Sequence, residues 1–161
     1  MKKILIESIP YVAIILVVIL IRTFLVTPIR VSGTSMYPTL NNGNIMILNK
    51  VAKIDRFDIV VIKSSDSNPV LIKRVIGLPG ETIEVKDGKI YINNKKINDK
   101  YGYGTTYDFD KVKVGKNDYF VLGDNRTVSA DSRIYGTFNK SRIKGTTKLR
   151  LFPFNKIGTV K

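Results

Sequence analysis

The distribution of apolar residues divides the chain into two parts. No charged residue occurs from Ile9 to Ile21, and the apolar stretch resumes after Arg22 and Thr23 and ends at Pro28. Roughly 20 apolar residues span the hydrocarbon core of a bilayer, so residues 9–28 are predicted to form one transmembrane helix. Lysines at positions 2 and 3 favour a cytoplasmic location for residues 1–8. A cleaved signal sequence is the alternative, but the small residues of a cleavage site do not follow the apolar stretch.

From residue 29 onward, short β-branched or aromatic runs alternate with Gly, Asn, Asp and Pro, a pattern typical of strands and turns. Two consecutive hairpins are predicted over residues 82–97, with turns at Asp87-Gly88 and Asn93-Asn94. Residues 98–117 are interpreted as an irregular loop. Further strands are expected at residues 45–49, 58–62, 70–76 and 119–122, and residues 138–151 as either a short helix or a last pair of strands. The sequence therefore predicts an all-β domain over residues 29–161.

The charge and the missing residue types restrict the partners. The net charge is +14, but the lysines are spread along the chain, which argues against nucleic-acid binding and favours a basic surface that faces anionic lipid or wall polymer. The chain contains neither cysteine nor histidine. Disulfides and thiolate metal sites are therefore excluded, and a zinc site is disfavoured. We expect no metal and no organic cofactor.

The same absences narrow the possible chemistry. Without histidine a Ser-His-Asp triad is impossible, and without cysteine there is no thiol nucleophile. A serine nucleophile still needs a base, and lysine is then the leading candidate. Ser35 lies in SGTSMYPTL (32–40), and Lys73 lies in IKRVIGLPG (72–80).

The neighbours of Lys73 favour its burial. In a strand, Lys73 shares one face with Leu71 and Val75, while Arg74 points to the other face. Burial among apolar side chains lowers the pKa of a lysine. A shift of roughly 2–3 pKa units would raise the neutral fraction at pH 7 from about 0.04% to several per cent. A strand lysine considered alone is usually a surface residue, so the interpretation depends on its companions.

The segment GDNRTVSADSR (123–133) supplies those companions. If residues 129–133 are extended, Ser129, Asp131 and Arg133 face the same way. An ion pair of Asp131 with Arg133 can then fix Ser129, whose hydroxyl can orient the Lys73 amine. In addition, Arg74 can pair with Asp124 across the back of the strand. The alternative is a polar loop held together by its own charges.

Together these segments resemble the bacterial type I signal peptidases, the membrane-bound serine proteases that remove signal peptides from exported proteins. The resemblance covers nearly the whole chain and includes GNIMILNK (43–50), KRVIGLPGE (73–81) and Phe152-Pro153-Phe154. It implies twisted antiparallel sheets, with Ser35 as the nucleophile and Lys73 as the general base.

The resemblance also implies roles for the residues around this dyad. Ser129 holds the lysine, Asp131 and Arg133 support Ser129, and an Arg74–Asp124 pair braces the site. Gly33 stands where some relatives carry a serine that completes the oxyanion hole, and glycine there resembles the Gram-positive branch. The hole is therefore expected to depend on backbone N–H groups, chiefly that of Ser35.

The substrate is expected to bind as an added strand beside residues 29–31 and 71–72. By the resemblance, small residues, above all Ala, stand one and three positions before the cut, in an Ala-X-Ala pattern. The apolar residues expected to line their pockets are Ile29, Val31, Leu40 and Ile72. The expected partners are exported preproteins and the lipid bilayer, with the catalytic domain on the extracytoplasmic side of the cell membrane.

Two other functions are compatible with parts of the pattern. One is another Ser-Lys protease, either a dedicated processing peptidase of a secretion or conjugation system or a self-cleaving repressor. The other is an inactive, membrane-tethered β-domain that binds lipid or wall polymer. An inactive domain would be expected to have lost its catalytic positions, whereas Ser35, Lys73 and Ser129 are all present.

Overall fold

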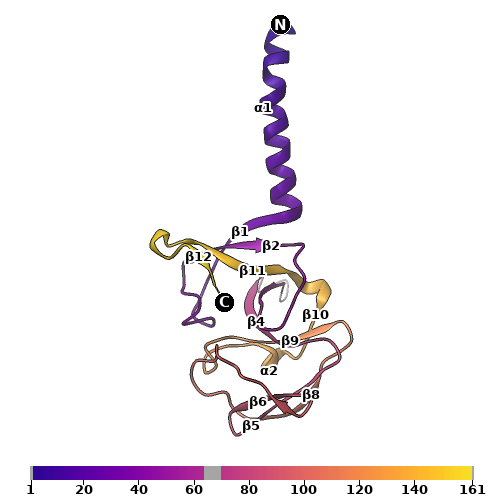
Figure 1. Ribbon diagram of the computed structural model, residues 1–161, viewed down its shortest axis with the longest axis vertical. Helices are drawn as coiled ribbons and strands as arrows, with labels where there is room; N and C mark the ends of the chain where they lie inside the picture. The colour runs from indigo at the N-terminus through magenta and orange to yellow at the C-terminus, as the bar shows by residue number, and fades with distance from the viewer. Residues whose placement is uncertain (1, 64–69, 161) are drawn as a thin grey trace.

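The computed structural model describes residues 2–63 and 70–160, with side chains described from residue 9 onward. A long helix, α1 (Lys2–Leu20), projects from a β-domain (Figure 1). Its side chains from Ile9 to Leu20 are exposed. Among the described residues, no helix meets the length and apolarity needed to cross a membrane.

The helix ends differently from the prediction. A short π-helical turn (Ile21–Leu25) follows α1, and strand β1 (Val26–Arg30) begins inside the segment that was predicted to be helical up to Pro28. The strand forms because its residues pair antiparallel with β2 (Ile45–Asn49). Lys50 Nζ donates hydrogen bonds to the Arg22 and Thr23 carbonyls and so satisfies acceptors that the helix end leaves unpaired.

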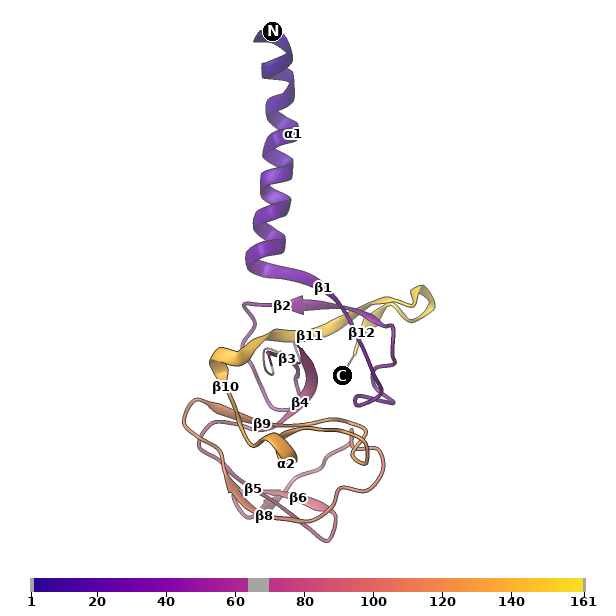
Figure 2. The ribbon, with the colours of Figure 1, turned by 180° about the vertical axis from the view of Figure 1, so that it is seen from behind.

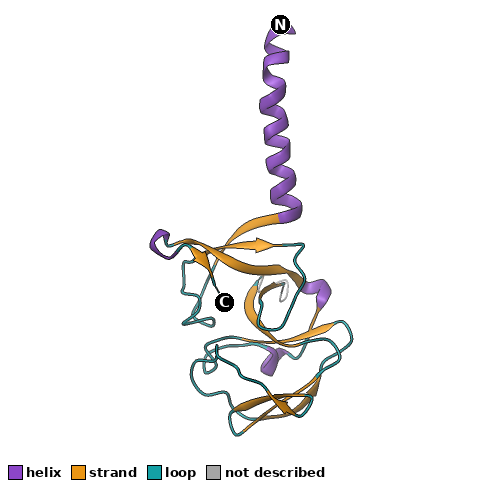
Figure 3. Cartoon of the chain, viewed as in Figure 1, coloured by secondary structure: helices purple, strands orange, loops and turns teal. Residues whose placement is uncertain are grey.

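The described strands form two antiparallel sheets (Figure 3). The first has the order β1-β2-β11-β3-β4-β9-β10, with β12 paired to β11. Its other members are β3 (Ile59–Ile62), β4 (Leu71–Gly77), β9 (Asp118–Leu122), β10 (Phe138–Asn139), β11 (Ile143–Phe152) and β12 (Gly158–Thr159). Short helices α2 (Ser132–Tyr135), η2 (Lys140–Arg142) and η3 (Phe154–Lys156) connect its later strands.

The second sheet has the order β7-β6-β5-β8. Its strands are β5 (Thr82–Lys86), β6 (Lys89–Ile92), β7 (Lys95–Lys96) and β8 (Phe109–Lys113). Seen from behind in Figure 2, β5, β6 and β8 lie at the end of the domain that is remote from α1. The prediction of an all-β domain of antiparallel sheets is confirmed.

The two predicted hairpins are present, with Asp87, Asn93 and Asn94 at positive φ in their turns. The prediction of an irregular loop was wrong. Residues 98–117 contain β8, an edge strand of the second sheet, whose Asp and Lys side chains hide the strand pattern.

Residues 138–151, for which the sequence left a short helix or a last pair of strands open, contain both kinds of element. They contribute β10, η2 and most of β11, a long strand that lies between β2 and β3. Position 145 in β11 requires glycine, because a Cβ atom there would lie 2.2 Å from the Asn49 carbonyl oxygen. This glycine interrupts the apolar pattern of the strand. The register of β11 also shifts at bulges, so its apolar residues do not alternate regularly.

Buried apolar residues form three clusters. One joins the two sheets and contains Ile76, Ile83, Val85, Ile90, Ile92, Val114, Phe120 and Leu122. A second lies under the β1–β2 connection and contains Val31, Met36, Leu40, Met46, Ile59 and Val160. The third contains Val60, Ile62, Val75, Tyr119, Val121 and Phe138. The second and third clusters contain residues of β3 and so lie close to the middle of the first sheet.

The Phe120→Ala substitution is expected to lower the free energy of unfolding by about 3–5 kcal/mol, because it empties a site in the core between the sheets. Phe120 is fully buried and stacks on Phe109 at a centroid separation of 5.5 Å. Denaturation of the full chain in detergent micelles measures the effect. Phe154→Ala is the control, since Phe154 is 78% exposed and its loss should change stability by less than about 0.5 kcal/mol. Equal losses for the two variants would contradict the assigned core.

Candidate active site

A groove of about 310 Å³ lies between the segment that follows β1 and the beginning of β4. It is lined by Arg30, Val31, Ser32, Gly33, Ser35, Met36, Val70, Leu71, Ile72 and Lys73. A larger cavity of about 490 Å³ lies against β6 and the following loop and includes neither Ser35 nor Lys73. No cluster of three side chains able to hold a metal ion occurs in the part of the chain that the structure describes.

Ser35 and Lys73 meet in the smaller groove. Lys73 Nζ lies 2.8 Å from Ser35 Oγ, within hydrogen-bond reach. The lysine comes from β4, which lies between β3 and β9 in the first sheet, and it is only 3% exposed. Its strand partner is Val60, and Val75, on its own face, belongs with Val60 to the third apolar cluster. The apolar surroundings expected for Lys73 are therefore present.

Burial lowers the pKa of Lys73 below the ordinary 10.5. The Asp131 carboxylate acts in the opposite direction, the Arg133 guanidinium lowers the pKa further, and Asp124 raises it slightly. Desolvation is the dominant effect, so the net direction is downward. A neutral amine next to a serine hydroxyl can accept the proton of that hydroxyl.

Asp131 organises the segment beside the dyad. Its carboxylate accepts hydrogen bonds from Arg133 Nε at 2.8 Å, Arg133 Nη2 at 2.9 Å and the Gly123 amide at 2.9 Å. The predicted ion pair of Asp131 with Arg133 is present. The extended backbone on which that prediction was conditional stops at Asp131, because the short helix α2 begins at Ser132. Asp131 caps the short helix α2, because its carboxylate also accepts from the Arg133 amide.

Ser129 is buried close to Ser35, but its hydroxyl makes no hydrogen bond within the described structure. The bond predicted from Ser129 to Lys73 is therefore not formed. Its position is fixed through the backbone, because Arg133 Nη2 donates to the Ser129 carbonyl at 3.2 Å. A Cβ atom on Gly123 would lie 2.1 Å from Ser129 Oγ and 2.5 Å from the Ser35 carbonyl oxygen. Glycine at position 123 thus allows Ser129 and Ser35 to approach each other.

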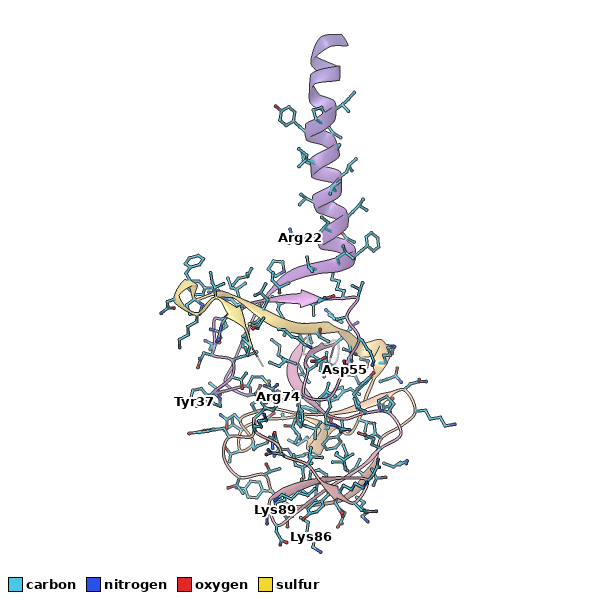
Figure 4. The ribbon with its side chains drawn as sticks, in the orientation of Figure 1. Arg22, Tyr37, Asp55, Arg74, Lys86 and Lys89 are labelled. Carbon is cyan, nitrogen blue, oxygen red and sulfur yellow. The ribbon has the colours of Figure 1, made fainter. Side chains whose placement is uncertain are left out.

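The pair of Arg74 with Asp124 lies on the other face of β4, as the sequence predicts (Figure 4 labels Arg74). Arg74 Nε and Nη2 donate to the two carboxylate oxygens at 2.8 and 2.7 Å, and both side chains are buried. Arg74 Nη1 also donates to the Phe57 carbonyl, and its guanidinium lies 3.7 Å from the ring centroid of Tyr101. This pair attaches β4 to the segment that follows β9.

Asn125 was missed by the sequence reasoning. Its backbone N–H donates to the Ser35 carbonyl at 3.0 Å, and its side-chain Nδ2 donates to the Thr34 carbonyl at 3.3 Å. These bonds hold the nucleophile segment against the 123–133 segment. Asn125 lies within GDNR, but a backbone contact across 90 residues leaves no local pattern in the sequence.

The backbone around Ser35 determines which groups can stabilise an oxyanion. Gly33 has a φ of 87°, which side-chain-bearing residues rarely adopt, and its amide donates to Asn42 Oδ1 at 3.0 Å. The Ser35 amide donates to no other described residue. The Ser35 amide is therefore available to an oxyanion, whereas the Gly33 amide is occupied and Gly33 acts by shaping the turn.

The predicted substrate-contacting residues are only partly in the groove. Val31 and Ile72 line it, together with Met36, Val70 and Leu71. Leu40 and Ile29 do not. Leu40 is fully buried in the second apolar cluster, and Ile29 packs against the same cluster. Both side chains support the groove from below, because apolar character alone does not distinguish a pocket wall from the core beneath it.

Comparisons with known proteins identify the family of this chain. The family model described as "Signal peptidase, peptidase S26" matches residues 5–152. Signal peptidase I T of Bacillus subtilis (strain 168) is 43% identical, over 91% of this chain and 84% of that protein. Signal peptidase I of Streptococcus pneumoniae serotype 4 is 35% identical, over 86% of this chain and 88% of that protein. The crystal structure of a signal peptidase I from Enterococcus faecalis V583 matches with a TM-score of 0.54 and 34% identity, over 60% of this chain and 97% of that chain.

The Lys73→Met substitution is expected to stabilise the protein most at low pH. Between the lowered pKa of Lys73 and its ordinary value of 10.5, the unfolded chain binds more protons than the folded chain. The free energy of unfolding of the unsubstituted protein therefore rises with pH across this window. Below the window, the folded chain carries the full desolvation of the ammonium group. Methionine has no charge to desolvate, so the variant loses this pH dependence.

Denaturation of the full chain in detergent micelles, from about pH 5 to about pH 10, measures this difference. Lys96→Met is the control, because Lys96 is exposed in β7 and should not change the slope. Parallel pH profiles for Lys73→Met and the unsubstituted protein would show that folding does not shift the pKa of Lys73.

Proposed function

The chain belongs to the peptidase S26 family of signal peptidases and cleaves signal peptides from preproteins, and we propose that it does so with a Ser35–Lys73 dyad. The observation that carries this assignment is the separation of 2.8 Å between Ser35 Oγ and a lysine amine whose pKa is lowered by burial. Ser35 is the nucleophile, and Lys73 is the general base.

The steps follow from the geometry of the groove. Neutral Lys73 accepts the Ser35 proton as Oγ attacks the carbonyl carbon of the residue before the cut. The Ser35 amide donates to the developing oxyanion. Lys73 then returns the proton to the leaving amine, which departs with the mature chain. A water molecule that gives its proton to Lys73 hydrolyses the acyl-enzyme.

Two sheet edges can bind the substrate segment that precedes the cut. Strand β1 pairs on one side only, with β2. Strand β4 pairs with β9 only from Arg74 onward, so the described structure leaves the β9-facing edge unpaired from Leu71 to Lys73. An extended peptide can form backbone hydrogen bonds there. Met36, Val31 and Ile72 narrow the groove, and this favours small side chains such as Ala at alternate positions.

Residues 9–25 serve as the membrane anchor in this proposal, with the N-terminus cytoplasmic and the catalytic domain extracytoplasmic. The exposed apolar surface of α1 and its continuation supports this disposition. Figure 1 shows the turn between β11 and β12 at the level of β1, where the helix enters the domain. This turn exposes Phe152, Phe154 and Ile157 and carries Lys156, a combination suited to a lipid interface.

Ser35→Ala and Lys73→Ala are each expected to lower preprotein processing by about a thousandfold or more. Lys73→Arg should fail equally, because a guanidinium group does not release its proton in this pH range. Processing of an Ala-X-Ala preprotein in detergent or lipid is the measurement. Ser141→Ala and Lys89→Ala, both at exposed positions, should retain normal rates. Normal processing by Ser35→Ala or Lys73→Ala would end the dyad assignment.

Ser129→Ala is expected to give a slower enzyme, by up to about a hundredfold. The side chain is buried against Gly123, near the Ser35 carbonyl, so its loss loosens the packing around Ser35 without removing the base. Rates measured against pH distinguish the possible roles. Activity that is lost at every pH would show that Ser129 takes part directly in proton transfer. An unchanged rate would show that Ser129 has no role in catalysis.

A further inference from the structure

The catalytic groove is closed on one side of Ser35. Arg74 of β4 is in register with Leu122 of β9, so the free edge of β4 ends after Lys73. The residues after β9 then lie against the nucleophile, because the Asn125 amide donates to the Ser35 carbonyl. An extended substrate can follow β4 only as far as Lys73. Beyond the cut, the chain must leave over the surface next to Asn125.

Two tyrosines stand at this exit. Tyr37 follows Ser35 by two residues, and Tyr103 comes from the loop that precedes β8. Their rings pack edge to face with centroids 5.3 Å apart, yet the two residues remain 41% and 51% exposed. We call Tyr37 and Tyr103 the exit pair. Its exposed ring surface is available for a ligand.

Backbone contacts fix the exit pair relative to the nucleophile. The Tyr103 amide donates to the Asp124 carbonyl at 2.7 Å, and the Arg126 amide donates to the Tyr103 carbonyl at 2.9 Å. Tyr103 also forms a parallel bridge with Asn125, the residue that holds the Ser35 carbonyl. The position of Tyr103 is therefore tied to the position of the catalytic serine.

The direction of the substrate follows from the arrangement of the chain. The groove begins near Arg30, at the end of β1, and reaches Ser35 and Lys73. Figure 4 shows Tyr37 farther from α1 than β1 is, near the level of Arg74. The part of the substrate before the cut thus lies toward the helix, and the part after the cut extends toward the exit pair.

From these contacts we propose that the exit pair binds the side chain of the second residue of the mature protein and favours an aromatic or large aliphatic residue there. The inference rests on the proposed function. In an extended chain, the residue before the cut and the second residue after it point to the same side, toward the enzyme. Tyr37 lies in the same turn as Ser35, since its backbone N–H donates to the Thr34 carbonyl at 3.0 Å, so its ring stands within a few residues' reach of the cut. A ligand that packs on exposed tyrosine rings gains most binding free energy when its contacting group is apolar or aromatic.

Two matched substrates test the proposal. Both carry the same Ala-X-Ala signal segment, and they differ only in having Phe or Gly as the second residue after the cut. With the full chain in detergent micelles, kcat/KM for the Phe substrate should be about tenfold higher, mainly through KM. Tyr103→Ala should remove most of this preference, and Tyr103→Phe should keep it, because the ring and not the hydroxyl makes the contact.

Tyr107→Ala is the matched control. Tyr107 lies four residues further along the same loop and is 66% exposed, so the variant removes a tyrosine without touching the exit pair. It should keep the Phe preference. The proposal is overturned if the unsubstituted enzyme cleaves both substrates equally well. It is also overturned if the preference survives in both Tyr37→Ala and Tyr103→Ala.

A measurement on the unsubstituted enzyme covers the case in which an alanine variant does not fold. A short peptide that represents the mature N-terminus, with Phe as its second residue, should inhibit more strongly than its Gly counterpart, and equal inhibition would count against the exit pair. Failure of the proposed function has a different signature. Cleavage of either substrate by Ser35→Ala would refute the dyad and would leave the Phe-to-Gly ratio as a separate result.

Discussion

The burial of the Lys73 amine beside the Ser35 hydroxyl is the constraint on which the rest of the domain depends. A lysine in water is almost entirely protonated at neutral pH and cannot act as a base. Strand β4 removes the amine from water by placing it beside the third apolar cluster, with Val60 opposite and Val75 on the same face. Because the strand is hydrogen-bonded to β3 and from Arg74 onward also to β9, the amine cannot easily move back to solvent. The fold therefore supplies the desolvation that the chemistry needs.

The two faces of β4 serve different purposes. Lys73 faces the groove, and Arg74 on the opposite face is buried in a bidentate pair with Asp124. A buried ion pair often contributes little net stability, because both charges lose their hydration. Its contribution here is positional. Asp124 is followed by Asn125, whose backbone N–H donates to the Ser35 carbonyl, so the pair connects the strand of Lys73 to the segment of Ser35.

The features that could be predicted from the sequence are those with a local pattern. Alternation along β4 was enough to place Lys73 and Arg74 on opposite faces, and the Asp-Gly and Asn-Asn pairs identified the hairpin turns. Edge strand β8 was missed because Asp110 and Lys111 are exposed in succession, where its pairing with β5 shifts register, so its apolar residues do not alternate.

Features that depend on distant contacts could not be predicted in the same way. Leu40 and Val31 both belong to the second apolar cluster, and only the tertiary packing decides that Val31 also lines the groove whereas Leu40 does not. The helix α2 forms because the Asp131 carboxylate caps it, and this capping competes with the extended conformation that the spacing of Ser129, Asp131 and Arg133 suggested. The Ser129 hydroxyl is consequently left without the predicted bond to Lys73.

The acids near Lys73 are each paired with an arginine, and this limits how far they raise the pKa of Lys73. Asp131 and Asp124 both raise the pKa of Lys73, and an unpaired carboxylate at either position would favour the ammonium form. Each acid is instead bound by its own arginine, Asp131 by Arg133 and Asp124 by Arg74. The positive charge of each arginine offsets the negative charge of the acid that it binds. Desolvation then determines the state of the lysine, and the positive charge of Arg133 acts in the same direction.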